Sequence, residues 1–133
     1  MRDTGVYPED LPRGECLRLM STVGVGRIIY TRQALPAVEL VNFTLDGGDI
    51  VISTFRSQLA SAVRDSVVAF ETDQFSAQYK AGWNVTVIGR SREVAPLPVN
   101  GHEHLLRVTP EIITGRALRL TPEPHHEPAA MSS

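Results

Sequence analysis

The stretch VGRIIYTRQALPAVELVNFTLDGGDIVIST, residues 25–54, decides the fold, because its apolar residues follow the period of a strand and not that of a helix. Segments 25–31 and 36–45 are rich in β-branched and aromatic residues, and the short connection between them predicts an antiparallel hairpin. Asp46-Gly47-Gly48 predicts a second turn, because Asp and Gly tolerate positive φ, and this turn leads into a third strand at 49–54. The sheet therefore starts as an antiparallel meander.

Two helices are predicted beside this meander. Residues 10–23 carry apolar side chains at helical spacing, with Asp10 as the expected N-cap. Cys16 lies beside that apolar stripe and is expected to pack as a small core residue. Residues 57–64 predict a second, shorter helix with Ser57 as its cap.

The rest of the chain predicts further strands. Residues 66–72 form one, and 82–94 form the longest alternating run, in which Gly89 indicates a bulge or a sharp bend. Residues 101–106 predict at most a helical turn, and 107–120 resume strand character. The pattern predicts a mainly β fold with minor α content: a six- to seven-stranded antiparallel sheet with short helices, folded into a small closed or split β-barrel and not a sandwich of sheets.

Composition limits the possible classes of protein. The 133 residues, 14.6 kDa in mass, suit one domain, and 42% hydrophobic against 21% charged residues excludes a mainly disordered or coiled-coil chain. Lys and Arg number 13 against 15 Asp and Glu, scattered along the chain, so no basic stripe for nucleic acid is expected. With a single cysteine and no long apolar run, we expect a cytoplasmic protein without membrane association.

The domain boundaries follow from the same patterns. Residues 1–9 are interpreted as an N-terminal extension and 10–120 as the split-barrel domain. Residues 121–133 are polar and proline-rich, which predicts a disordered C-terminal tail.

Enzyme signatures that depend on side chains are absent from the sequence. Residues 24–29 break the dinucleotide fingerprint after Gly26, and neither a Walker lysine nor a nucleophile-elbow serine occurs. His102-Glu103-His104 lacks the further ligands that zinc needs, so no metal site is predicted. Residues 53–58 bring hydroxyls, a guanidinium and a helix start together, which suits a phosphate monoester. Capping serines and a solvated arginine would produce the same pattern.

These segments, in this order, resemble the pyridoxamine-phosphate-oxidase-like flavin-binding split-barrel superfamily, in particular its small actinobacterial members. The resemblance covers roughly residues 10–120. It is carried by the opening helix and the segments that follow it: Val25-Gly26-Arg27-Ile28, Pro36 before Val41-Asn42-Phe43, Asp46-Gly47-Gly48, Val51-Ile52-Ser53-Thr54, Val68-Ala69-Phe70-Glu71, Gly82-Trp83 to Gly89-Arg90, and Pro110 to Gly115-Arg116.

The resemblance implies a homodimer with an FMN site in each groove between the subunits. Carried over by position, Val41, Asn42 and Phe43 border the ring and Trp83 flanks it. The phosphate is held by five residues of the strand end and helix start: Ser53, Thr54, Arg56, Ser57 and Gln58.

Two of these positions depart from the superfamily. Where relatives commonly place an arginine this chain has Ser53, and where they commonly place a lysine it has Gln58. Each lost charge-assisted hydrogen bond is worth roughly 1.5–3 kcal/mol, so FMN affinity is expected to fall by about 100-fold or more.

Three functions follow as hypotheses. The first is an FMN-dependent oxidoreductase acting on a small-molecule substrate, with no catalytic side chain named. The second is a deazaflavin-dependent reductase, whose longer cofactor would need basic residues beyond the phosphate loop; the candidates are Arg27, Arg64, Arg90 and Arg92. The third is a non-enzymatic module that binds flavin or haem, with His102 and His104 as axial candidates.

Overall fold

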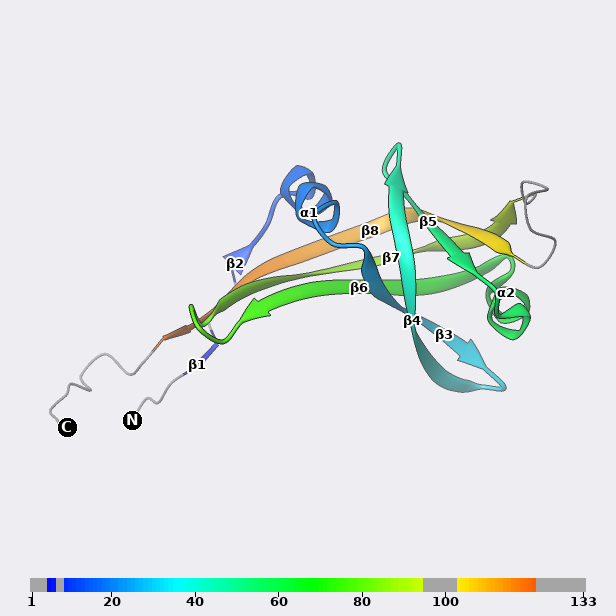
Figure 1. Cartoon of the computed structure of the whole chain (residues 1–133), viewed down its shortest axis with the longest axis horizontal. Helices are drawn as coiled ribbons and strands as arrows, with labels where there is room; N and C mark the ends of the chain where they lie inside the picture. The colour runs from blue at the N-terminus through cyan, green and yellow to red at the C-terminus, as the bar shows by residue number, and fades with distance from the viewer. Residues whose placement is uncertain (1–4, 7–8, 95–102, 122–133) are drawn as a thin grey trace, which may run out of the picture.

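The computed structural model describes residues 5–6, 9–94 and 103–121 (Figure 1). Antiparallel strands dominate, and the described part contains two helices. In chain order the elements are β1 Gly5–Val6, β2 Glu9–Asp10, α1 Arg13–Met20, β3 Val25–Arg32, β4 Leu35–Asp46, β5 Asp49–Thr54, α2 Ser57–Val63, β6 Ser66–Ser76, β7 Ala81–Val94 and β8 His104–Thr121.

Strands β3 to β8 close into a barrel. Their order is β8-β5-β4-β3-β6-β7, and β8 also pairs with β7, so the sheet returns to the strand where it started. All of these pairings are antiparallel. Figure 1 shows β6, β7 and β8 running side by side along the long axis, while the β3–β4 hairpin leaves the body at an angle. The predicted antiparallel split barrel is confirmed.

Helix α1 starts later than the sequence predicted, whereas helix α2 starts at Ser57 as predicted. Helix α1 begins at Arg13 after an extended Pro12, and the predicted cap Asp10 is wrong, because Asp10 pairs with Arg116 in the β2–β8 ladder. Helix α2 has Arg56 at its N-cap position, so the prediction that Ser57 is the cap is also wrong. Pairing with β8 thus outweighs the local capping preference of Asp10.

Strand β8 replaces the helical turn expected at 101–106. The strand begins at His104, and Leu105 and Leu106 pair with Ser53 and Ile52 of β5. Leu106 is fully buried, so its side chain gains more from the barrel core than from a local turn. Residues 101 and 102 lie outside the described residues.

Gly89 forms the bulge that the sequence predicted. The β7–β8 register shifts between Ile88 and Gly89, and Gly89 stands opposite Pro110. A Cβ at Gly89 would lie 2.1 Å from the carbonyl oxygen of Thr109. Only a residue without a side chain lets the two backbones approach this closely, which accounts for the glycine in the middle of a strand.

The core fills the barrel with the inward residues of each strand. Phe43 of β4 and Phe70 of β6 meet edge to face with ring centroids 4.8 Å apart. Cys16 of α1 is fully buried, and its Sγ lies so close to Gly115 of β8 that a Cβ there would approach it to 2.4 Å. The prediction that Cys16 packs as a core residue is therefore confirmed, and burial raises the pKa of its thiol.

The outer face of the barrel carries a row of apolar side chains. The strand register places these residues directly opposite one another across β4, β3, β6, β7 and β8, and we call them the outer apolar row: Val38, Ile29, Ala69, Ile88 and Ile112. Val38 and Ile112 are more than half exposed. The row thus leaves apolar side chains exposed along one line across five strands.

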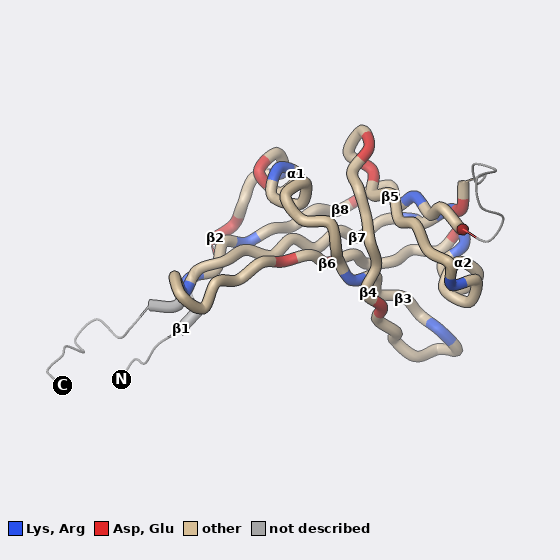
Figure 2. The backbone as a smooth tube through the Cα atoms, in the orientation of Figure 1, with Lys and Arg blue, Asp and Glu red and all other residues tan. Residues whose placement is uncertain are grey.

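Figure 2 shows Lys and Arg positions interspersed with Asp and Glu positions along the described backbone. Within the described ranges, no helix is both long and apolar enough to cross a bilayer. Thr121, the first residue of the predicted C-terminal tail, pairs with Gly5 of β1, and residues 122–133 lie outside those ranges.

Candidate functional site

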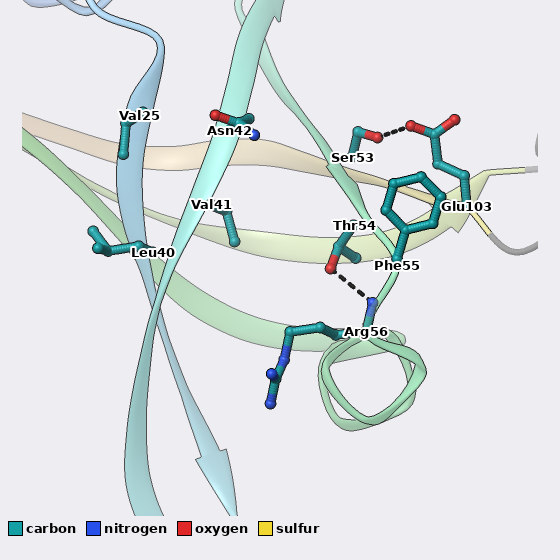
Figure 3. A pocket seen from close by; sticks show the side chains of 9 residues that line it. All are labelled: Val25, Leu40, Val41, Asn42, Ser53, Thr54, Phe55, Arg56 and Glu103. Carbon is teal, nitrogen blue, oxygen red and sulfur yellow. Dashed lines mark hydrogen bonds between the residues drawn. The ribbon is translucent and has the colours of Figure 1, made fainter.

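A cleft of about 590 Å³ opens where β3, β4, the end of β5 and the start of β8 meet (Figure 3). Its size lies within the usual range of small-molecule sites. The described residues that line it are Val25, Leu40, Val41, Asn42, Ser53, Thr54, Phe55, Arg56 and Glu103.

One wall of the cleft is apolar. Val25 of β3 and Leu40 of β4 project from the outer face of these strands, and they are 51% and 69% exposed. Val41 points inward and is buried. Asn42 lies opposite Val25 in the ladder and presents its amide at the same edge. Exposed aliphatic side chains beside one amide offer a surface for a flat ring with polar atoms on its rim.

The other end of the cleft is polar. Strand β5 ends in Ser53 and Thr54, and the Thr54 hydroxyl accepts a hydrogen bond from the backbone N–H of Arg56, 3.0 Å away. This bond shapes the corner between β5 and α2. The Ser53 hydroxyl donates to the carboxylate of Glu103, as Figure 3 shows.

Arg56 takes part in an ion pair at this corner. Its Nε lies 2.8 Å from Oε1 of Glu39, and the Tyr30 hydroxyl donates to Oε2 of the same carboxylate at 2.6 Å. Burial, followed by the hydrogen bond to Glu39, raises the pKa of Tyr30, so the hydroxyl keeps the proton that it donates. Glu39 is therefore held from two sides and directs the Arg56 guanidinium toward β4.

A second hollow of about 350 Å³ continues the cleft and shares Val25 and Leu40 with it. Arg27 and Asp73 line this hollow, and Arg27 Nη1 lies 2.9 Å from Glu71 Oε1 and 3.5 Å from Asp73 Oδ2. Burial and the neighbouring Asp73 raise the pKa of Glu71. Of the four arginines considered for a longer cofactor, Arg27 alone borders the cleft or this hollow among the described residues.

The structure brings five of the nine predicted cofactor residues together. Val41, Asn42, Ser53, Thr54 and Arg56 all line the cleft.

The other four lie elsewhere. Ser57 and Gln58 line a separate hollow beside Arg32, Phe43 points into the core against Phe70, and Trp83 packs against the core from β7. Their roles in cofactor binding stay predictions. Of the haem candidates, His104 contacts Glu93 at 2.6 Å, and His102 lies outside the described residues.

Four lining residues were missed by the sequence reasoning: Val25, Leu40, Phe55 and Glu103. The strand alternation could have found Leu40, because it shares the outer face with Asn42 two positions on. Glu103 could not have been found, because it lies 50 residues from Ser53 in the chain and is brought next to it by the pairing of β5 with β8.

The cleft fits the two ends of a flavin unequally. The apolar wall with its amide edge suits an isoalloxazine ring. The polar end suits a phosphate less well, because Arg56, the one arginine among the described lining residues, pairs with Glu39, and the Ser53 hydroxyl donates to the carboxylate of Glu103. The residues therefore fit the ring, and they offer a doubly charged phosphate a single cation, Arg56, which is already paired with Glu39.

Comparisons with known proteins agree with this architecture. The family model described as pyridoxamine 5'-phosphate oxidase matches residues 12–128. The uncharacterized protein Rv0080 of Mycobacterium tuberculosis is 35% identical over 125 residues, which cover 80% of this chain and 82% of that protein.

Solved structures share the fold. The FAD binding protein from Mycobacterium smegmatis is 31% identical, with a TM-score of 0.73 over 86% of this chain and 100% of its own. A FAD-binding protein from Mesorhizobium loti is 17% identical, with a TM-score of 0.76 over 86% of this chain and 98% of its own. The family match and the relative above 30% identity together show that the chain belongs to the pyridoxamine 5'-phosphate oxidase family of flavin-binding split barrels.

Proposed function

We propose that this protein binds a flavin in the cleft and acts as a flavin-dependent oxidoreductase on a small-molecule substrate. The observation that carries the proposal is the cleft itself, in which an exposed apolar wall on β3 and β4 faces a hydroxyl- and arginine-bearing corner between β5 and α2. The solved structure at 31% identity is described as an FAD binding protein, which supports the choice of a flavin.

The chain's own residues would bind and orient the ring. Val25 and Leu40 would cover one ring face and exclude water from it, and the Asn42 amide would hydrogen-bond to polar atoms of the rim. Thr54 and Arg56 would hold the ribityl and phosphate end. The flavin, when bound, supplies the hydride or electron transfer, so no side chain is assigned a catalytic role.

A homodimer is part of the proposal. The outer apolar row runs across five strands, and Val38 and Ile112 are each more than 50% exposed in the single chain. An uncovered apolar row of this kind on a closed barrel supports packing against a second copy about a two-fold axis. Val25 and Leu40 lie on the same outer face, so the second copy would also close the open side of the cleft.

The identity of the cofactor is tested by titration. Purified protein is titrated with FMN, FAD, the deazaflavin and haem, and binding is followed by flavin or deazaflavin fluorescence and by the Soret absorbance. The proposal expects saturable quenching with FMN or FAD at micromolar concentrations. The variant Leu40→Asp, which places a charge on the apolar wall, is expected to weaken that binding at least tenfold.

Redox activity is tested on the flavin-loaded protein. Anaerobic addition of NADH or NADPH followed by oxygen should bleach and then restore the flavin absorbance. If the protein binds flavin but the bound flavin is not reduced and reoxidised with any reductant tried, the result would support the non-enzymatic module instead. Tight deazaflavin binding with no FMN or FAD binding would support the deazaflavin-dependent reductase, and a Soret band alone would support a haem module.

A further inference from the structure

The second hollow lies beside the part of the cleft where the flavin ring is proposed to lie. Its volume of about 350 Å³ is within the range of small-molecule sites, and it shares Val25 and Leu40 with the cleft. We propose that this hollow is a substrate subsite, in which Arg27 and Asp73 bind a neutral planar molecule through a carboxamide or lactam edge. The inference rests on the proposed function, because it places the substrate next to the flavin ring.

The hollow forms where β3 separates from β6. Pairing between the two strands ends at Arg27 and Glu71, whereas β6 continues along β7 beyond that point. The Thr72 hydroxyl donates to the backbone carbonyl of Val25 at 3.1 Å, so a side chain joins the strands there in place of the ladder. Arg27 and Asp73 therefore border the opening between the two strands.

The two carboxylates beside Arg27 differ in how firmly they hold it. Nη1 of Arg27 lies 2.9 Å from Oε1 of Glu71, whose side chain is 18% exposed. The same nitrogen lies 3.5 Å from Oδ2 of Asp73, whose side chain is 46% exposed. A long, exposed ion pair of the second kind adds little to stability, so a ligand can replace it at low cost. Glu71 therefore positions the guanidinium, and Asp73 is available to a ligand.

Arg27 and Asp73 offer a donor and an acceptor side by side. Among the described residues, Nη1 makes both side-chain contacts of the guanidinium, which leaves its Nε and Nη2 groups to donate to a ligand. Asp73 accepts through Oδ2, which leaves Oδ1 as a further acceptor. An amide presents a carbonyl oxygen and an N–H on one edge, so it can accept from Arg27 and donate to Asp73 at the same time.

The charges around the hollow disfavour an ion of either sign. A ligand carboxylate at Arg27 would also face Asp73 and Glu71, and a ligand ammonium at Asp73 would also face Arg27. Attraction and repulsion at similar distances largely cancel. A neutral amide hydrogen-bonds to both groups without such repulsion, and Val23 and Leu40 give its flat body an apolar wall.

The test compares three pyridines that differ in one substituent: nicotinamide, nicotinate and the aminomethyl analogue. The full-length protein is first titrated with riboflavin, which has no phosphate and so makes the result independent of the polar end of the cleft. The riboflavin-loaded protein is then titrated with each pyridine, and Kd is measured from NMR chemical-shift changes. In wild type, nicotinamide should bind more tightly than the aminomethyl analogue and at least about tenfold more tightly than nicotinate.

Asp73→Asn removes the negative charge that repels a carboxylate. It should raise the nicotinate to nicotinamide affinity ratio about tenfold and leave the riboflavin affinity within about twofold. Asp46→Asn is the matched control, since Asp46 is exposed, also pairs with an arginine, Arg107, and does not line the hollow. If Asp73→Asn does not fold, Arg27→Gln serves instead, and it should make the aminomethyl analogue the tightest of the three ligands.

The inference is overturned if wild type binds none of the pyridines, if it prefers nicotinate or the aminomethyl analogue, or if Asp73→Asn leaves the affinity ratio unchanged. It is also overturned if Asp73→Asn weakens riboflavin binding and leaves the ratio unchanged, because the hollow would then hold the flavin itself. Failure of riboflavin to bind wild type would refute the proposed function, and the pyridine affinities of the unloaded protein would then test the hollow separately.

Discussion

Replacing Gly89 by alanine tests the closure of the barrel between β7 and β8. The added Cβ would lie 2.1 Å from the carbonyl oxygen and 2.8 Å from the carbonyl carbon of Thr109, both backbone atoms. Because real Cβ contacts stay beyond 3.0 Å, the two strands must separate by about 1 Å at the bulge. Overpacking of this kind costs about 1–3 kcal/mol, and the lower chain entropy of alanine returns less than 1 kcal/mol.

We expect Gly89→Ala to lower the free energy of unfolding by about 2 kcal/mol and Tm by about 8 °C. Urea denaturation followed by the fluorescence of Trp83, the one tryptophan of the chain, measures this change. Gly24→Ala is the matched control, since no heavy atom lies within 4 Å of its added Cβ, and its stability should stay within about 0.5 kcal/mol of wild type. Equal stability of the two variants would refute the close approach at Gly89.

Three further changes test the corner, the outer face and the pH response. Glu39→Gln releases the guanidinium of Arg56 and should tighten FMN binding about threefold to tenfold by fluorescence titration; weaker binding would contradict the offset charge. Ile88→Lys places a charge in the outer apolar row and should convert a dimer to a monomer in sedimentation, whereas an unchanged mass would exclude that face. Hydrogen bonds, first from His104 and then from Arg64, lower the pKa of Glu93 below its ordinary value of 4.5. The stabilisation by these bonds is therefore present above pH 4.5 and is lost as the pH falls below it. In Glu93→Gln, Tm should depend less on pH in that acidic range, and a Tm profile identical to that of wild type would count against the interaction.

Much of the fold could be predicted because local sequence patterns determine it. The period of two over residues 25–54 predicts the β3–β4–β5 meander, and Gly47 and Gly48 adopt the positive φ that their turn requires. Gly89 predicts the bulge, because a glycine inside a strand contributes no side-chain packing and commonly marks a bulge or a close approach of two backbones.

The errors lie where distant pairing decides the local structure. Asp10 has the residue type of a helix cap but pairs with Arg116, and Leu106 reads as part of a turn but is buried in β8. No local signal identifies either partner, because Asp10 pairs with Arg116 and Leu106 pairs with Ile52, and both partners lie far away in the chain.

The candidate site divides in the same way. The cleft brings together two short segments that the resemblance identifies, contributing Val41, Asn42, Ser53, Thr54 and Arg56. The carboxylates that alter its charge, Glu39 and Glu103, reach it through side-chain geometry and through the β5–β8 register. Sequence spacing contains neither kind of information.

A crystal structure of the protein grown with excess FAD tests the central claim most directly. We expect the isoalloxazine ring to lie on Leu40 and Val25, with the ribityl chain directed toward Thr54. A ring bound on any other surface, or a cleft closed by the protein's own side chains, would contradict it.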